Sequence, residues 1–391
     1  MNRVRTGLEQ LLADPPAWIK GRRLGLLCNP ASVDRRFRHA RDLLAQRFPG
    51  ALSTLFSPQH GFFAEKQDNM IESADMTDPV LGLPVFSLYG TTRIPSPEMF
   101  SGIDVLLVDL QDVGTRVYTF ISTLSHCMET ARDCGKPVVV LDRPNPVGGA
   151  AVEGNLLAAE CSSFVGRYPM PMRHGLTMGE LARVFNTRFG IGCELEVVRM
   201  AGWKRAMLFG DTGLPWVAPS PNLPTPVAAL VYPGQVLWEG TNLSEGRGTT
   251  QPFELFGAPF LDTVRLLADL GEPPVAGAVL RPAVFEPTSN KWRGQRCAGF
   301  QIHPTDPQRY APYAATLRLM QAIRRRHPRE FAWRPPPYEY EHETMPIDLL
   351  IGDRSIRQRL EDLEPIERIE ASWRGPLEEF KAMSREHYLY N

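Results

Sequence analysis

A short apolar run that ends in a dense polar cluster constrains the fold of this chain more than any other feature. Residues 105–108 (VLLV) have the character of a strand that is buried on both faces. The run leads into a cluster around Gly114 whose polar members are Asp109, Gln111, Asp112, Thr115, Arg116 and Tyr118. Ligands of an open α/β sheet bind where its strands end at their carboxyl edge. The segment therefore predicts an α/β sheet with a small-molecule site at the end of this strand.

Strand and helix patterns alternate along the first half of the chain. The apolar runs predict strands over residues 23–29, 52–56, 84–88, 105–109, 137–141 and 194–200. Between them, the spacing predicts helices over residues 38–48, 118–134 and 177–189. In the last of these helices, Thr177 and Glu180 have the spacing of a capping box. This alternation is typical of a Rossmann-like, doubly wound parallel sheet.

The stiff segment PSPNLPTP at residues 219–226 indicates a boundary between two domains. We expect a Rossmann-like catalytic domain over residues 1–228 and a smaller α+β auxiliary domain over residues 229–391. The auxiliary domain contributes the polar loop 241–254, and its clearest helices are predicted over residues 312–325 and 347–360.

Composition excludes several classes of protein. The 391 residues carry a net charge of −1, so no global field favours nucleic acid or an anionic membrane. No apolar run approaches the roughly 18 residues that a membrane-spanning helix needs. The six cysteines form no CxxC pair, which favours free thiols in a reducing compartment. With no apolar core of signal-peptide length near Met1, the sequence predicts a cytoplasmic protein, and nothing indicates an obligate protein partner.

Paired polar residues follow two of the predicted strands. His60 comes after strand 52–56, where a histidine can donate a proton or bind a substrate, or simply stabilise a turn. Glu65 lies five residues further on. Asp109 and Asp112 lie beside Arg116, where two carboxylates can divide acid and base roles or form an ion pair that holds the loop.

Two further motifs carry arginine. Arg143 and Asn145 belong to the rigid segment DRPNP, which can present fixed donors and acceptors or form an Asx turn. Arg173 and His174 precede the helix that starts near Thr177. Since helix N-termini attract anions, this pair indicates a carboxylate or phosphate contact, with helix capping as the alternative.

The loop 241–254 (TNLSEGRGTTQPFE) combines two glycines, four hydroxyl residues and an arginine close to a glutamate. Such a density of polar groups favours a functional site. Glu239 and Glu245 are candidate acids. Tyr232 and Trp238 can stack on the face of a sugar, although packing in the core is the commoner role of aromatic residues.

Several motifs are absent from the sequence. It has no GxGxxG, no GxxxxGK[ST], no GxSxG, no HExxH and no Cys/His cluster, so we expect neither a cofactor nor a metal. The remaining chemistry is catalysis by carboxylates, whose standard use is glycoside hydrolysis.

Seven motifs in order carry a resemblance to a known family: LPVFSLYG, DLQDVGTRVYTF, VLDRPNPVGG, RHGLTMGELA, SPNLPT, EGTNLSEGRGTTQPFE and FGAP. Together they resemble the bacterial NamZ-type exo-β-N-acetylmuramidases. The resemblance implies a Rossmann-like domain that carries the active site, an auxiliary C-terminal domain and no nicotinamide cofactor. It also implies release of terminal β-linked N-acetylmuramic acid from the non-reducing end of peptidoglycan fragments, in cell-wall turnover or recycling.

The chain departs from the family in two places. The family commonly has Pro-Glu-His-Gly after the second strand, whereas this chain has Gln59 before His60, and an amide cannot protonate a leaving group. In the segment after His60 the family usually has a Gly-Glu pair, whereas this chain reads EKQDNMIES, and Glu65 or Glu72 is expected to supply the carboxylate there. The catalytic carboxylates are then expected among Glu65, Asp109, Asp112 and Glu245, in no fixed order. The expected substrate-binding residues are Gln59, His60, Gln111, Arg116, Tyr118, Arg143, Asn145, Arg173, His174, Asn222, Asn242 and Arg247.

Within that set, Arg116, Arg143, Arg173 or Arg247 is expected to hold the lactyl carboxylate of a muropeptide or amino-sugar substrate. The glutamine at position 59 keeps a second hypothesis open, a non-catalytic protein that binds or senses muropeptides. A third, a nucleotide-sugar or NAD enzyme of Rossmann type, is disfavoured by the missing glycine fingerprint.

Overall fold

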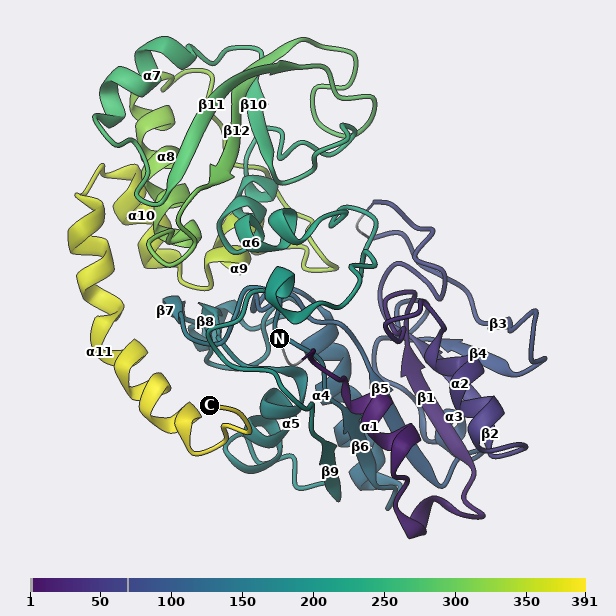
Figure 1. Cartoon of the computed structure of the whole chain (residues 1–391). Coiled ribbons are helices and arrows are strands. Elements are labelled where there is room, and N and C mark those ends of the chain that lie inside the picture. Colours follow the sequence, from purple (N-terminus) through teal and green to yellow (C-terminus); the bar gives the residue numbers. More distant parts are fainter. Residues whose placement is uncertain (1–2, 69) are drawn as a thin grey trace.

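The computed structural model describes residues 3–68 and 70–391, and a large sheet dominates its first half (Figure 1). The sheet has the order β3-β4-β2-β1-β5-β6-β9. Its strands are β1 (Leu24–Cys28), β2 (Leu52–Ser57), β3 (Met76–Thr77), β4 (Pro84–Ser87), β5 (Val105–Asp109), β6 (Val138–Leu141) and β9 (Leu195–Val198). All neighbours pair in parallel except β3 with β4. Numbered along the chain, the six parallel strands follow the Rossmann order 3-2-1-4-5-6. The predicted doubly wound fold is confirmed.

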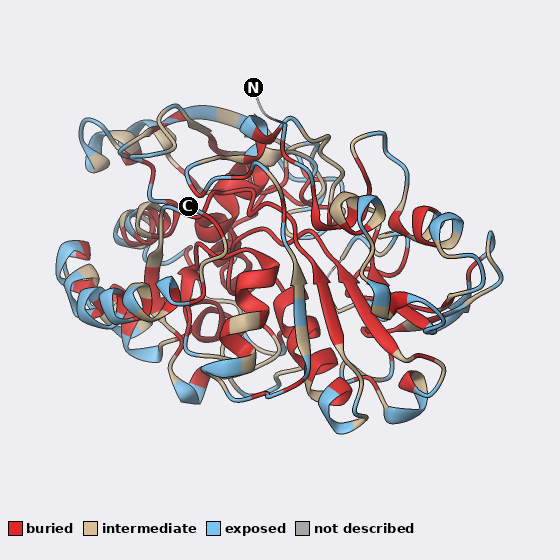
Figure 2. Cartoon of the chain, turned by 60° about the horizontal axis from the view of Figure 1, so that its bottom comes forward, coloured by how far each residue is buried: buried red, intermediate tan, exposed pale blue. Residues whose placement is uncertain are grey.

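Helices cover both faces of this sheet because its central strands are apolar on both faces. Val105 and Leu107 of β5 pack with α1 (Gly7–Ala13) and α2 (Ala40–Arg47). Leu106 and Val108 point to the opposite face and join the core of α4 (Phe120–Asp133) and α5 (Met178–Thr187). This alternation follows from the two-residue period of a strand. Figure 2 shows the result, with buried strands in red between helices whose outer surfaces are exposed.

Short elements complete the first half of the chain. They are the 3₁₀ turns η1 (Ala17–Ile19), η2 (Ala159–Cys161) and η3 (Phe209–Thr212), the short helix α3 (Pro97–Phe100), and the antiparallel pair β7 (Glu153–Leu156) and β8 (Pro171–Arg173). The predicted capping box at the start of α5 is present, since Thr177 and Glu180 exchange side-chain to backbone hydrogen bonds. None of the described helices is long and apolar enough to cross a membrane.

The second half forms a smaller antiparallel sheet with helices beside it (Figure 1). The order is β10-β12-β11, from β10 (Leu255–Ala258), β11 (Ala278–Phe285) and β12 (Cys297–Pro304). Around it lie α6 (Pro226–Gln235), η4 (Val236–Gly240), α7 (Thr263–Leu270) and α8 (Pro312–Arg326). Since α6 begins at Pro226, the domain boundary predicted after residue 228 falls inside the first turn of a helix. The division into residues 1–228 and 229–391 stays a prediction.

The prediction of one helix over residues 347–360 is wrong. The structure has α9 (Pro346–Ile351) and α10 (Arg354–Glu361) instead. Gly352 adopts a left-handed conformation with φ of +77°, which ends α9. The Asp353 side chain then accepts a hydrogen bond from the backbone N–H of Ser355 and starts a new helix.

A long C-terminal helix, which the sequence analysis did not predict, connects the two halves. Helix α11 (Ile366–Arg385) runs from the second half back to α5, where the chain ends (Figure 1). There the Tyr390 hydroxyl donates to Asp142 Oδ2 at 2.6 Å, and the Leu389 backbone N–H donates to Glu180. The tail of the second half is therefore anchored on the first.

Candidate active site

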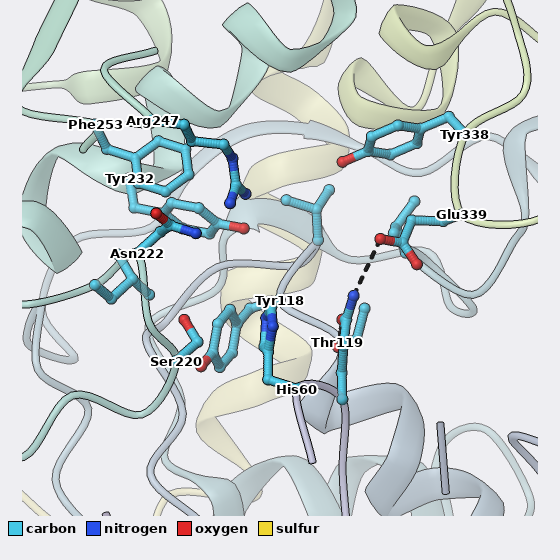
Figure 3. A pocket seen from close by; sticks show the side chains of 14 residues that line it. His60, Tyr118, Thr119, Ser220, Asn222, Tyr232, Arg247, Phe253, Tyr338 and Glu339 are labelled. Carbon is cyan, nitrogen blue, oxygen red and sulfur yellow. Dashed lines mark hydrogen bonds between the residues drawn. The ribbon is translucent and has the colours of Figure 1, made fainter. Parts of the chain in front are cut away.

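A cavity lies beyond the carboxyl ends of β2 and β5, where loops of both halves meet (Figure 3). The space that no atom fills there, including the part open to solvent, is about 400 Å³. The lining residues are Gln59, His60, Val117, Tyr118, Thr119, Val165, Ser220, Asn222, Leu223, Tyr232, Arg247, Phe253, Tyr338 and Glu339. Gln59, His60, Tyr118, Asn222 and Arg247 are thus five predicted site residues that the structure brings together.

At the topological switch point between β1 and β5, where Rossmann enzymes bind ligands, Gln111 and Arg143 help to line a smaller pocket, and polar side chains around it pair with one another. Arg143 donates two hydrogen bonds to the buried Asp109 carboxylate, at 2.5 and 3.0 Å. The Ser32 hydroxyl donates to the Asp109 carbonyl, and the Asn29 amide donates to the carbonyl of Pro219 at 2.8 Å. Asp109 and Arg143 therefore form a buried ion pair outside the cavity of Figure 3, and their roles at the substrate stay predictions.

Asp112 also has a structural environment. Its Oδ2 accepts a hydrogen bond from the Gly114 N–H at 2.8 Å and lies 3.3 Å from Nε2 of His174. Both side chains are buried, and neither lines the cavity. The Gln111 amide donates to the backbone carbonyls of Asp112 and Pro144, each at 2.8 Å. The predicted roles of these three residues at the substrate are not supported by this geometry.

Four more predicted residues direct their side chains to backbone carbonyls away from the cavity. Arg116 donates to the carbonyls of Asn155, Met170, Leu350 and Ile351, Arg173 to Val147, Asn145 to Leu176 and Asn242 to Glu330. Burial lowers the pKa of Arg116 to about 10. Arg116, Arg173 and Asn145 hold loops in place because buried carbonyls need donors, whereas the bond from Asn242 to Glu330 is exposed.

Glu65, the remaining candidate acid of the first half, is exposed and does not line the cavity. Its carboxylate lies over Gly61, where an added Cβ would come within 2.9 Å of it. The structure therefore places Glu65 on the loop behind His60 rather than at a bound substrate.

Arg247 enters the cavity from the loop that follows η4 and belongs to a buried group of charges, here called the Arg247 cluster: Arg247, Glu239, Glu245 and Lys291. Arg247 Nη2 donates to Glu239 Oε1 at 2.7 Å, and its Nε lies 3.2 Å from Glu245 Oε1. Lys291 Nζ lies 2.7 Å from Glu245 Oε2. Burial acts to raise the pKa of Glu245, but the two cations hold this pKa below its usual value. Glu245 is thus an ionised ion-pair partner, which argues against its predicted role as an acid.

Glu339 supplies the carboxyl group of the cavity, and the sequence analysis missed it. Its Oε1 accepts a hydrogen bond from Gln59 Nε2 at 3.1 Å, the dashed line in Figure 3. Its Oε2 accepts one from the Tyr89 hydroxyl at 2.5 Å. Thr119 in turn donates to Gln59 Oε1 at 2.6 Å, which orients the amide. Burial raises the pKa of Glu339, while the bonds from Tyr89 and Gln59 act to lower it.

No local signal marks Glu339 in the sequence. It lies in the segment PYEYEHE before α9, with Glu341 and Glu343 close behind it and no neighbouring strand of the large sheet. Its neighbour Tyr338 also lines the cavity and donates to Glu239 Oε2 at 2.7 Å. The segment therefore links the cavity carboxyl to the Arg247 cluster.

Neutral and aromatic groups form the rest of the cavity. Burial lowers the pKa of His60 to about 4, so its imidazole is neutral near pH 7 and acts as a hydrogen-bond partner. Its Nδ1 lies 2.7 Å from the carbonyl oxygen of Lys66. The ring of Tyr232 meets that of Phe253 edge to face at 4.8 Å and that of Tyr118 at 6.0 Å. Such rings offer flat apolar faces to a sugar.

A Rossmann-ordered sheet with a polar, aromatic-walled cavity and a buried carboxyl at its carboxyl edge defines an enzyme that acts on a small polar molecule. Comparison with known families specifies the class. Residues 24–227 match the family described as "Exo-beta-N-acetylmuramidase NamZ, N-terminal", and residues 230–390 match its C-terminal counterpart. The chain belongs to the NamZ family, which confirms the family predicted from its motifs.

Relatives match the chain along nearly its whole length. It is 42% identical over 388 residues to the peptidoglycan beta-N-acetylmuramidase NamZ of Bacillus subtilis strain 168, covering 99% of this chain and 92% of the relative. Two crystal structures of DUF1343 family proteins from Bacteroides fragilis have the same fold. One has a TM-score of 0.89 at 34% identity, covering 100% of this chain and 99% of that one. The other has a TM-score of 0.77 at 27% identity, covering 99% of each chain.

Proposed function

We propose that this protein is an exo-β-N-acetylmuramidase that releases terminal β-linked N-acetylmuramic acid from the non-reducing end of peptidoglycan fragments. The observation that carries the proposal is the cavity itself, which combines one buried carboxyl with an arginine and aromatic walls. Membership of the NamZ family along the whole chain supports it. Action in the cytoplasm and a role in cell-wall recycling stay predictions.

Arg247 is our candidate for the group that recognises N-acetylmuramic acid. This sugar differs from N-acetylglucosamine by a lactyl ether that carries a carboxylate, and arginine binds carboxylates with two parallel hydrogen bonds. Of the four arginines considered from the sequence, Arg247 is the one that lines the cavity. Arg116, Arg143 and Arg173 are engaged with backbone carbonyls or with Asp109. Arg247 is therefore placed to select a muramic over a glucosamine substrate.

The test is release of a chromogenic aglycone from a β-N-acetylmuraminide, with the matching β-N-acetylglucosaminide as control. Release from the muraminide alone is the expected result. Release from neither would favour the hypothesis of a non-catalytic muropeptide-binding protein, which Gln59 keeps in view. Calorimetric titration with a muropeptide would then measure that binding, and a thermal shift with NAD would test the nucleotide-dependent alternative.

A further inference from the structure

We propose that Glu339 is the general acid of this enzyme and protonates the glycosidic oxygen, with Gln59 and Tyr89 as its positioning residues. The inference rests on the proposed function. Of the described residues that line the cavity, Glu339 is the one carboxyl. It is 5% exposed, and both of its oxygens have a defined neighbour, so the group is held at one place in the cavity wall.

The neighbours of Glu339 set it apart from the other carboxylates near the cavity. Asp109 is paired with Arg143, and Glu245 with Lys291 and Arg247, so each of these carboxyl groups has an adjacent cation as its partner. A general acid must instead carry a proton before the reaction. The hydrogen-bond partners of Glu339 are a neutral amide and a phenol. Because a phenol hydroxyl can donate or accept, Tyr89 can bond to the carboxyl group in either protonation state.

More distant charges around Glu339 oppose one another. Glu239 acts to raise its pKa, and Arg93 acts to lower it. The Arg93 guanidinium lies over the ring of Tyr340 at 3.2 Å from the centroid. With these effects opposed, burial of the carboxyl group dominates and raises its pKa, as a proton donor requires.

The step balances as a hydrolysis. The Glu339 carboxyl gives its proton to the glycosidic oxygen while the bond from C1 of the muramic sugar to that oxygen breaks and its electron pair stays on the oxygen. The leaving sugar departs as a neutral alcohol. Water then forms a bond to C1, and the proton that this water loses restores the Glu339 carboxyl. Gln59 orients Glu339 by donating a hydrogen bond from its amide to Oε1 of that carboxyl group.

The experiment compares two substrates in wild type and in Glu339→Gln. The first is the β-linked disaccharide of N-acetylmuramic acid and N-acetylglucosamine, whose leaving alcohol needs a proton. The second is the 2,4-dinitrophenyl β-muraminide, whose leaving phenolate needs none. We expect kcat on the disaccharide to fall by about 10²- to 10⁴-fold. On the activated substrate we expect a fall of less than about tenfold, because general acid catalysis contributes little there.

The matched control is Glu343→Gln, an exposed glutamate of the same segment, for which kcat on both substrates should equal that of wild type. An equal fall of kcat on both substrates in Glu339→Gln, or no fall on either, would overturn the assignment. Wild type that hydrolyses neither muraminide would instead refute the proposed function, and the assignment with it.

A second variant keeps the test decisive if Glu339→Gln does not fold. Tyr89→Phe removes the hydroxyl that donates to Glu339 Oε2. Loss of this donor destabilises the ionised carboxylate and raises the pKa of Glu339. Because the acid form is the active one, the alkaline limb of kcat/KM should move to higher pH. A limb that stays in place would show that Glu339 has only a packing role.

Discussion

Substitution of Arg247 by methionine tests how the enzyme distinguishes its sugar. Methionine keeps much of the apolar stem but removes the guanidinium that lines the cavity. A hydrogen bond to a charged group contributes about 1.5–3 kcal/mol, which corresponds to a loss of about 10- to 150-fold in affinity. We expect this loss for N-acetylmuramic acid and not for N-acetylglucosamine, because only the former carries the lactyl carboxylate.

The same substitution also lowers stability, and the design of the assay must separate the two effects. Removing one partner of a buried ion pair costs about 3–5 kcal/mol. The loss should lie near the lower end, about 3 kcal/mol, because Lys291 remains at Glu245 and Tyr338 remains at Glu239. Damage to the fold weakens the binding of both sugars by the same factor. The ratio of their dissociation constants therefore reports only the recognition of the lactyl carboxylate.

The assay is calorimetric titration of both sugars into wild type, Arg247→Met and the control Arg116→Met. Arg116 is another buried arginine, and it binds backbone carbonyls outside the cavity. The ratio should change only in Arg247→Met. If that variant bound both sugars more weakly by the same factor, the assignment of Arg247 to the lactyl carboxylate would be refuted.

Three further changes test the packing that supports the site. Burial raises the pKa of Glu153 to about 7 from the usual 4.5, so the folded protein holds a proton that the unfolded chain has lost. Stability should thus decline by about 3 kcal/mol as pH rises from 4.5 to 7. In Glu153→Gln, the free energy of unfolding measured with urea should decline less over this pH range. If wild type and variant declined equally with pH, protonation of Glu153 would not be the cause. Arg116→Met removes four hydrogen bonds to carbonyls and should lower the free energy of unfolding by about 4 kcal/mol; a loss below about 1 kcal/mol would refute that accounting. Gly234→Ala would place a Cβ 2.0 Å from the Pro312 carbonyl oxygen and push α6 from α8, so it should cost about 1–3 kcal/mol. Gly375→Ala, with open space around it, is the matched control, and equal melting temperatures for these two glycine variants would contradict this steric argument.

Some residues at the cavity can be predicted from the neighbouring sequence, and others cannot. His60, Tyr118 and Arg247 were predicted because each lies in a polar segment near a strand end or in a glycine-rich loop, and each lines the cavity. Asp109 lies in an equally polar segment, yet its side chain is buried against Arg143. Glu339 lies in a segment with no such pattern and is nevertheless the carboxyl of the cavity. Clusters of polar residues in the sequence therefore identified the edge of the sheet where the cavity lies. They did not distinguish side chains that face the cavity from side chains that hold loops in place.

By itself, the sequence determined the Rossmann-like sheet, most of its strands and helices, the capping box of α5 and the family. These properties follow from periodicity and from contacts between residues a few positions apart, which can be read along the chain. Only the tertiary structure decided which charges pair and which face the cavity. Gln59 meets Glu339 across 280 positions and Arg143 meets Asp109 across 34. The protonation of a carboxyl depends on burial and on such distant partners, so the choice of acid arises only when the two halves of the chain pack together.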